Sequence, residues 1–261
     1  MPGVTYSSYL RIDELLSLQQ PLSDGPEHDE LLFIVIHQSY ELWFKSMIHE
    51  MGACQSALES GDLHRALALI GRVRTIMKSL VSMVDILETM TPLQFNSFRD
   101  RLESSSGFQS GQFRVIEAML GRRDATHLGM FAEGSPLREA IAGAMSRNTM
   151  WDSLLALVSS RGHDLPADVI GRDRTEASSP DERVQATIER AYRTDAELSL
   201  LLERFVDLDE GLQEWRYRHV KMVERTIGTK AGTGGSSGRD YLVSTVFTPV
   251  FPDLWAVRNR F

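Results

Sequence analysis

The amino-acid sequence predicts an all-α protein, a helical bundle formed by one domain. Over most of the chain, apolar residues recur at three- and four-residue spacing, which places them on one face of a helix. Only the stretch 241–251 is mildly rich in β-branched residues. The 261 residues are 42% hydrophobic, enough for a sizeable buried core. We therefore expect several long helices that share one core.

The same three- and four-residue spacing predicts where each helix lies along the chain. The segment 29–51 is apolar nearly all round, so we expect it at the centre of the fold. Thr91 followed by Pro92 predicts the start of a short helix, because proline suits a first helical turn. A turn is expected near 207–211, between the last two long helices. The predicted helices are, in chain order, 29–51, 63–87, a short one from Pro92, 110–120, 136–145, 151–159, 181–208 and 207–228.

A charged and polar stretch at 171–182 has the composition of a linker. The helices predicted on either side of it are long and need each other's apolar faces. We therefore interpret the stretch as an excursion inside a single domain that covers residues 1–261.

Charge and cysteine content limit the possible functions. The formal charge of −8 arises from 28 basic and 36 acidic residues. No basic excess exists to displace counterions from a nucleic acid, so we expect no nucleic-acid partner. Cys54 is the only cysteine, which excludes an intramolecular disulfide and a cysteine-rich zinc site. This cysteine usage is typical of a reducing, cytoplasmic compartment.

Membrane association is not expected either. Residues 1–10 lack the basic and apolar regions of a signal peptide. The longest wholly apolar run, 31–36, is far shorter than the roughly 18 residues needed to span a bilayer. The sequence predicts a soluble protein.

His219 occupies a core-facing position on the last long helix. The ordinary interpretation is a core histidine that is hydrogen-bonded to a neighbour. The alternative is an axial ligand of a porphyrin iron, because basic residues flank His219 and can attract anionic propionates, whereas no second histidine or cysteine is spaced for zinc. The apolar stripe comprises Leu208, Leu212, Trp215, His219, Met222, Val223 and Thr226, and the flanking cations are Arg216, Arg218, Lys221 and Arg225.

His37 is a second histidine of this kind. On a helix it shares a face with Phe33, Tyr40 and Phe44. It is either a satisfied core residue or an acid/base or hydrogen-bonding group that faces an aromatic substrate, with Phe33 as a stacking wall. Two core-facing histidines on different helices favour the functional interpretation of each.

Arg99 and the glycine-rich segment 232–238 are the remaining candidates. Arg99 lies beside an apolar face formed by Phe95, Phe98 and Leu102. It either forms a surface pair with Glu103 or binds a substrate carboxylate through its planar guanidinium. The segment 232–238 follows no predicted strand and lacks the lysine of a phosphate-binding loop, so it does not indicate a nucleotide fold.

Several motifs in series resemble the tryptophan 2,3-dioxygenase family. The resemblance runs in order from near residue 5 to near residue 258 and is weakest between about 122 and 200. The motifs are TYSSYL at 5–10, HDELLFI at 28–34, His37-Gln38, Glu41-Leu42-Trp43, SGFQS at 106–110, EWRYRH at 214–219, the segment 232–238 and FPDLW at 251–255.

The resemblance implies an all-helical homotetramer with haem b between its helices. Such an enzyme inserts both atoms of O2 across the indole C2–C3 bond of L-tryptophan and yields N-formylkynurenine. His219 would be the proximal iron ligand and His37 the distal residue that hydrogen-bonds the indole N–H. Ser106 would lie near the haem on the distal side, and the haem iron would be ferrous in the active form.

The resemblance also implies the substrate-binding residues. Arg99 would hold the substrate carboxylate, and Thr233 the ammonium and carboxylate end. Three residues would line the pocket, namely Phe33, Phe95 and Leu102. Three more would reach across from a neighbouring subunit to complete its pocket, namely Tyr6, Tyr9 and Leu10.

The chain also departs from the family pattern, at Tyr40, Thr229 and Ala231. One alternative is therefore a haem oxygenase that adds a single oxygen atom to tryptophan or a substituted tryptophan in secondary metabolism, giving an oxindole. A non-catalytic haem-binding or haem-sensing protein and a helical scaffold without cofactor are the others. A sensor has no need of an amino-acid clamp such as Arg99 with Thr233.

Overall fold

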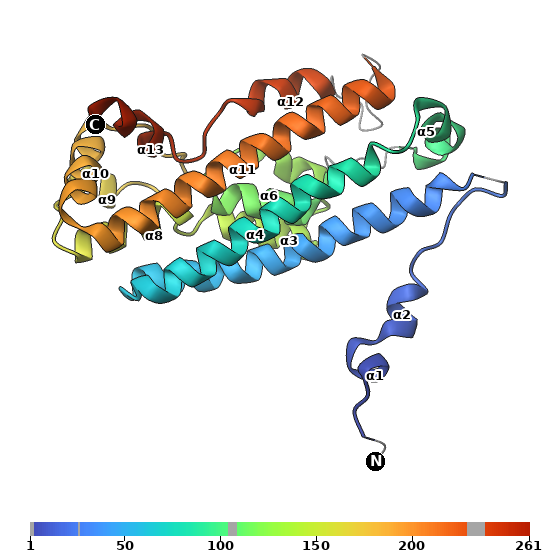
Figure 1. Ribbon diagram of the computed structural model, residues 1–261, viewed down its shortest axis with the longest axis horizontal. Helices are drawn as coiled ribbons and strands as arrows, with labels where there is room; N and C mark the ends of the chain where they lie inside the picture. Colours follow the sequence, from blue (N-terminus) through green and yellow to red (C-terminus); the bar gives the residue numbers. More distant parts are fainter. Residues whose placement is uncertain (1–2, 26, 104–108, 229–237) are drawn as a thin grey trace.

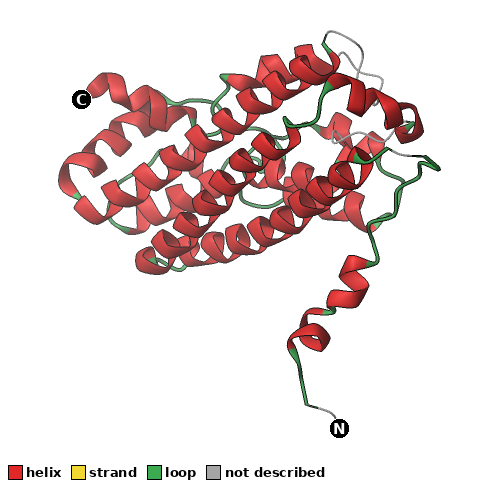
Figure 2. Cartoon of the chain, turned by 45° about the vertical axis from the view of Figure 1, so that its right-hand side comes forward, coloured by secondary structure: helices red, strands yellow, loops and turns green. Residues whose placement is uncertain are grey.

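The computed structural model describes residues 3–25, 27–103, 109–228 and 238–261, apart from the side chains of 238–241 (Figure 1). Every regular element within these residues is a helix, which confirms the predicted all-α class (Figure 2). The helices are α1 (Tyr6–Leu10), α2 (Ile12–Leu16), α3 (Asp29–Glu59), α4 (Leu63–Leu87), α5 (Pro92–Arg99), α6 (Gly111–Met119), α7 (Pro136–Met145), α8 (Met150–Ser160), α9 (Ala167–Ile170), α10 (Glu182–Thr194), α11 (Ala196–Ile227), α12 (Gly238–Val246) and α13 (Pro252–Ala256). Short 3-10 helices cover Asp100–Leu102, Ala125–Met130 and Val257–Arg260.

Three long helices, α3, α4 and α11, run side by side and form the body of the molecule (Figure 1). At one end α3 finishes while α4 and α11 begin, and we call this the closed end. At the other, which we call the cavity end, α3 begins while α4 and α11 finish. The closed end contains much of the hydrophobic core, including the fully buried side chains Met51, Cys54, Ala66, Ile70, Leu201, Leu202 and Phe205.

Local signals explain where the helices begin. Asp62 caps α4 by accepting a hydrogen bond from the backbone N–H of Arg65. Thr91 and Gln94 form a reciprocal capping box ahead of Pro92, so the predicted short helix starts where expected. Within the described part of the chain, none of the helices combines the length and apolarity needed to cross a bilayer.

The predicted turn near 207–211 is wrong, because α11 is continuous through it. The predicted helix 181–208 is instead divided at Asp195, between the end of α10 and the start of α11. The Asp195 side chain caps α11 by accepting a hydrogen bond from the N–H of Leu198. Gly211 lies inside α11, where an added Cβ would come within 3.2 Å of the Met77 side chain on α4. The glycine therefore permits close packing of two helices and does not mark a turn.

Buried ion pairs hold the polar stretch 171–182 against the body of the molecule. Asp152 on α8 is 6% exposed and forms ion pairs with Arg172 at 2.8 Å and Arg174 at 2.9 Å. Further along, the N–H of Asp181 donates to the Asp253 carboxylate on α13. The excursion thus lies against α8 and α13.

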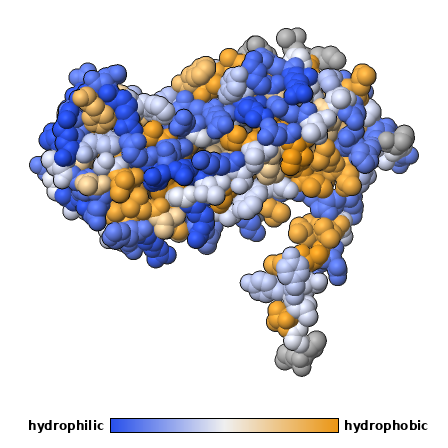
Figure 3. Space-filling model, viewed as in Figure 1, coloured by the Kyte–Doolittle hydropathy of each residue, from blue (hydrophilic) through white to orange (hydrophobic). Residues whose placement is uncertain are grey.

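The N-terminal arm, formed by α1 and α2, projects away from the body (Figures 1 and 2). Neither helix buries a residue, and the arm displays apolar side chains (Figure 3). Its base is attached to α3, where Glu30 accepts from the N–H groups of Leu22 and Ser23. The exposed apolar residues of the arm are Val4, Tyr6, Tyr9, Leu10, Leu15, Leu16, Leu18 and Leu22.

Candidate active site

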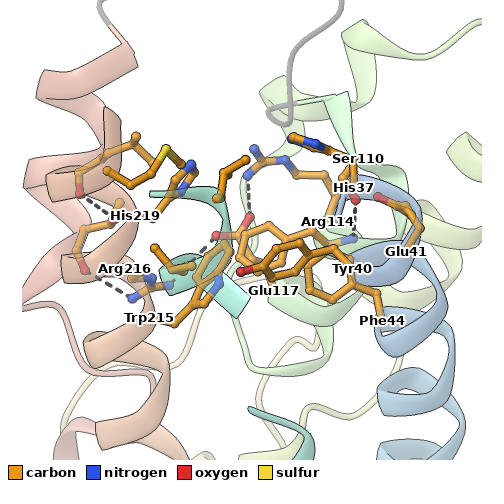
Figure 4. Close-up of a pocket in the computed structure, with 16 residues that line it drawn as sticks. His37, Tyr40, Glu41, Phe44, Ser110, Arg114, Glu117, Trp215, Arg216 and His219 are labelled. Atoms are coloured by element: carbon orange, nitrogen blue, oxygen red, sulfur yellow. Dashed lines mark hydrogen bonds and ion pairs between the residues drawn. The ribbon is translucent and has the colours of Figure 1, made fainter. Parts of the chain in front are cut away.

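A cavity of about 870 Å³, its mouth included, opens at the cavity end between α3, α4, α6, α11 and α12. This volume includes open solvent at the mouth of the cavity. Apolar side chains such as Phe44, Leu87 and Phe113 line much of it. His37 and His219 face it from opposite sides, on α3 and α11 (Figure 4). The structure thus brings the two predicted histidines into one site.

His219 lies where α11 passes from the core to the cavity. Leu212, two turns earlier on the same stripe, is fully buried, whereas His219 lines the cavity. The Nδ1 atom of His219 is buried and has no hydrogen-bond partner among the residues that the structure describes. Burial, with a contribution from nearby His37, lowers the pKa of His219 to about 4. The imidazole is therefore neutral near pH 7 and has a lone pair available for a metal.

His37 is held in one tautomer. Its Nδ1 lies 2.7 Å from the carbonyl oxygen of Phe33, and a carbonyl only accepts, so Nδ1 carries the proton. Burial lowers the pKa of His37, which keeps the ring neutral. Its Nε2 is consequently unprotonated and can accept a hydrogen bond from a ligand.

An aromatic cluster adjoins His37 at the start of α3. The Phe33 ring lies 4.0 Å from the His37 ring, 5.9 Å from Phe95 and 5.7 Å from Phe98, between centroids. Phe95 and Phe98 pack edge to face at 5.5 Å. The predicted pocket residues Phe33 and Phe95 are therefore neighbours, although α3 and α5 are far apart in sequence.

The structure describes only some of the other predicted substrate and cofactor residues. Arg99 is the last residue of α5, and Leu102 ends the 3-10 helix that follows; both are half-buried. Ser106 and Thr233 lie outside the described residues, as do Thr229 and Ala231. The predicted intersubunit residues Tyr6, Tyr9 and Leu10 are on the projecting arm, away from the cavity of their own chain (Figure 1).

Two buried charges at the cavity wall, Arg114 and Glu117, were not predicted from the sequence, and Arg216 was predicted only as one of several cations near His219. Arg114 and Glu117 on α6 and Arg216 on α11 are each at most 5% exposed, and all three line the cavity. Arg114 donates to Glu117 at 2.5 Å. A charged pair three residues apart inside the apolar run 113–120 is the signal that could have indicated them.

The cations that flank His219 in sequence mostly point elsewhere. Arg218 pairs with Asp85 on α4 and with Glu88, which caps the end of that helix, and Arg225 also pairs with Glu88. Lys221 pairs with Glu224 on its own helix. Of the four flanking cations, only Arg216 lines the cavity. The expected ring of cations around one anionic ligand is therefore wrong, because successive helical residues turn by about 100°.

Tyr40, a departure from the family pattern, has a packing role. Its hydroxyl donates to the Leu80 carbonyl of α4 at 2.7 Å, and its ring contacts Phe44 and Trp215. Burial raises the pKa of the Tyr40 phenol to about 12. Trp215 in turn packs on the His219 ring at 5.2 Å. Tyr40 thus joins the helices of the two histidines.

These features define a class of protein. The described residues include no group of three or more His, Cys, Asp or Glu side chains that can hold a metal ion. A single neutral histidine on an apolar wall instead suits a metal that brings its own equatorial ligands, as in a porphyrin. The fold and site define an all-α protein with a largely apolar cavity, which is faced by one neutral histidine that can bind a metal and by a second that can hydrogen-bond a ligand.

Comparisons with known proteins agree with this class. The family model described as tryptophan 2,3-dioxygenase matches residues 1–133 and 144–261. A protein of Anaeromyxobacter sp. (strain K) named tryptophan 2,3-dioxygenase is 57% identical over 98% of this chain and 96% of its own. Proteins of the same name from Anaeromyxobacter dehalogenans and Herpetosiphon aurantiacus are 56% and 54% identical, each over 98% of this chain, and over 96% and 98% of their own.

The chain belongs to the tryptophan 2,3-dioxygenase family. The resemblance recognised in the sequence motifs is thereby confirmed, and so is the prediction of an enzyme of this type.

Proposed function

We propose that this protein is a haem-dependent dioxygenase that converts L-tryptophan and O2 to N-formylkynurenine, the first step of tryptophan degradation by the kynurenine route. The observation that carries the proposal is the pair of neutral histidines facing one cavity. The Nδ1 of His219 has no hydrogen-bond partner within the described part of the chain, and the Nε2 of His37 can accept a hydrogen bond. Membership of the family supplies the reaction. The whole chain 1–261 would serve as one haem-binding domain, in the cytoplasm.

The residues present suit haem b. His219 would bind the iron, because its buried Nδ1 has no hydrogen-bond partner among the described residues and its lowered pKa keeps the ring neutral, as metal binding requires. The cavity that His219 faces is lined largely by apolar side chains. When bound, ferrous haem would supply the iron that activates O2. Ser106 would lie near it on the distal side.

His37 would orient the substrate. Because Nδ1 is committed to the Phe33 carbonyl, Nε2 is the acceptor for the indole N–H. The lowered pKa of His37 makes it a weak base, so we assign it a hydrogen-bonding role and no obligatory proton abstraction. Its position in the cavity would set which edge of the indole faces the reactive centre.

The aromatic cluster would form the wall beside the indole. Phe33 and Phe95 are in mutual contact next to His37, and Leu102 follows on the same short segment as Arg99. Arg99 would bind the substrate carboxylate through its planar guanidinium, with Thr233 at the ammonium and carboxylate end.

Self-association would complete the site. We propose a homotetramer in which Tyr6, Tyr9 and Leu10 of one subunit enter the pocket of a neighbour. The exposed apolar arm supports this, because contiguous apolar side chains on a projecting segment are typical of an interface. Tyr6 and Tyr9 are 75% and 76% exposed in the single chain.

One experiment tests the function. The protein is loaded with haem, reduced, and incubated in air with L-tryptophan, and the product mass is measured. We expect two added oxygen atoms and an opened ring. A single added oxygen would support the oxindole alternative, and a haem spectrum without turnover would support the non-catalytic one. Failure to bind haem would exclude the proposal.

A further inference from the structure

Arg216 is a buried guanidinium one helical turn before His219 on α11. It is 3% exposed, and arginine is always charged in proteins. A buried charge is retained only where polar groups replace the water it loses. The partners of Arg216 therefore show what this residue holds in place.

Two of the partners are main-chain carbonyls, one in the last turn of α12 and one two residues beyond the end of that helix. The Arg216 Nη1 atom donates to the Thr245 oxygen at 3.1 Å and to the Thr248 oxygen at 3.0 Å. The last carbonyls of a helix lack donors within the helix and carry partial negative charge. The guanidinium thus caps the C-terminal end of α12 from a neighbouring helix.

A third partner lies on α6. The Arg216 Nη2 atom is 3.9 Å from the Glu117 carboxylate, an ion-pair distance (Figure 4). Glu117 is itself fixed by Arg114 at 2.5 Å and by Arg122 at 3.4 Å. One guanidinium on α11 consequently contacts both α6 and α12.

All three elements contribute to the cavity wall. Leu242 and Thr245 of α12, Glu117 of α6 and His219 of α11 line the same cavity. The distance of this wall from His219 therefore depends on the contacts of Arg216.

We propose that Arg216 is a positioning residue, which fixes α12 and Glu117 relative to His219 and thereby sets the shape of the cavity for cofactor and substrate. The inference rests on the proposed haem and tryptophan function. It assigns Arg216 no contact with the reacting atoms. Its effect is transmitted through the end of α12 and through Glu117.

The test compares Arg216→Lys with two controls. Arg204→Lys is the matched substitution on the same helix, at a partly exposed pair with Asp207 near the closed end. Asp152→Asn weakens a buried ion-pair cluster on α8 and serves as the stability control. For each haem-loaded protein we would measure the unfolding midpoint, the rate of haem transfer to excess apomyoglobin, and kcat and KM for L-tryptophan.

Lysine retains the charge at position 216 but cannot contact two carbonyls and a carboxylate from one planar group. We expect Arg216→Lys to bind haem at normal stoichiometry, to release it roughly tenfold faster, and to raise KM roughly tenfold with a smaller change in kcat. Arg204→Lys should leave the unfolding midpoint, the haem-release rate, kcat and KM unchanged. Asp152→Asn should lower the unfolding midpoint without moving the haem-release rate or KM.

Two results would overturn the inference. In the first, Arg216→Lys releases haem and binds tryptophan within twofold of the unmodified protein. In the second, Asp152→Asn moves both quantities as far as Arg216→Lys does, which would reduce Arg216 to general stability. If the unmodified protein binds no haem, the proposed function itself fails, and this inference falls with it.

Discussion

The closed end and the cavity end of the molecule are built from the same three long helices but use them differently. At the closed end the facing side chains fill the space between helices, and Leu201 and Phe205 of α11 are fully buried. At the cavity end, the same stripe of α11 continues into Trp215 and His219, which line an open volume. One amphipathic helix thus contributes stability at one end and a ligand site at the other.

The buried polar atoms of different regions also differ in how completely they are hydrogen-bonded. At the boundary between the ends, the buried Asp209 carboxylate accepts from the N–H groups of Val250 and Phe251 and from Trp255 Nε1. At the cavity end, the buried Nδ1 of His219 has no hydrogen-bond partner among the described residues. An unpaired buried polar atom is costly, so this nitrogen indicates where a ligand belongs. The comparison predicts that substitutions at the two ends affect different measurements.

His219→Ala should have the largest effect on activity. Removing the proposed iron ligand should abolish stable haem binding, seen as loss of the Soret band, and lower tryptophan turnover by roughly 100-fold or more. The unfolding free energy of the haem-free protein should change by less than about 1 kcal/mol, because the lost packing is offset by removal of an unpaired buried nitrogen. A variant that retains a normal Soret band would show that another residue binds the iron.

Phe205→Ala should show the opposite pattern. The ring is fully buried and packs on Phe251 at 5.2 Å, so its removal leaves a cavity in the core. We expect the unfolding free energy from denaturant titration to fall by about 3 to 5 kcal/mol. The haem content and kcat of the fraction that remains folded should be unchanged. Loss of haem at full folding would mean that the two ends are coupled.

His37→Ala should have an intermediate effect, confined to the substrate. The haem spectrum should persist, whereas kcat/KM for L-tryptophan should fall by roughly 10- to 100-fold, because the indole N–H loses its acceptor. His37→Gln, which retains an acceptor oxygen, provides the control and should recover part of the loss. Equal loss of haem in His37→Ala and His219→Ala would contradict the distal assignment.

Much of the fold could be predicted from the sequence, because helix periodicity and caps are local. The predicted bounds 63–87 and 136–145 coincide with α4 and α7. The error at Gly211 has a tertiary cause, since the closeness of Met77 on another helix is not visible in the local pattern. The break at Asp195 depends on a single capping side chain.

The site was predictable only in part. His37 and His219 were recognised because each places a polar ring on an apolar stripe. Arg216 was recognised only as one of several cations, and its carbonyl partners lie 29 and 32 residues away. Glu117 was missed because a charged residue on an amphipathic helix usually faces solvent. Whether such a charged residue faces the cavity or solvent depends on its burial and on partners that are distant in sequence. Neither can be read from the local pattern.

The smallest predicted effect concerns the pH dependence of kcat/KM, which His37 at the cavity end should shift to lower pH. His37 accepts a hydrogen bond only while neutral, so kcat/KM for L-tryptophan should decline when His37 becomes protonated. Burial lowers the pKa of His37 below its ordinary value of 6.5, although the Phe33 carbonyl and Glu41 act in the opposite direction. Because the neutral form persists to lower pH, the midpoint of the decline in kcat/KM should lie below pH 6.5. The measurement is kcat/KM at pH values on both sides of 6.5, for the unmodified protein and for His37→Gln.

The decline should disappear in His37→Gln, which has no ring to protonate. A midpoint above 6.5, or a decline that survives this substitution, would show that a group other than a buried, neutral His37 controls the pH dependence.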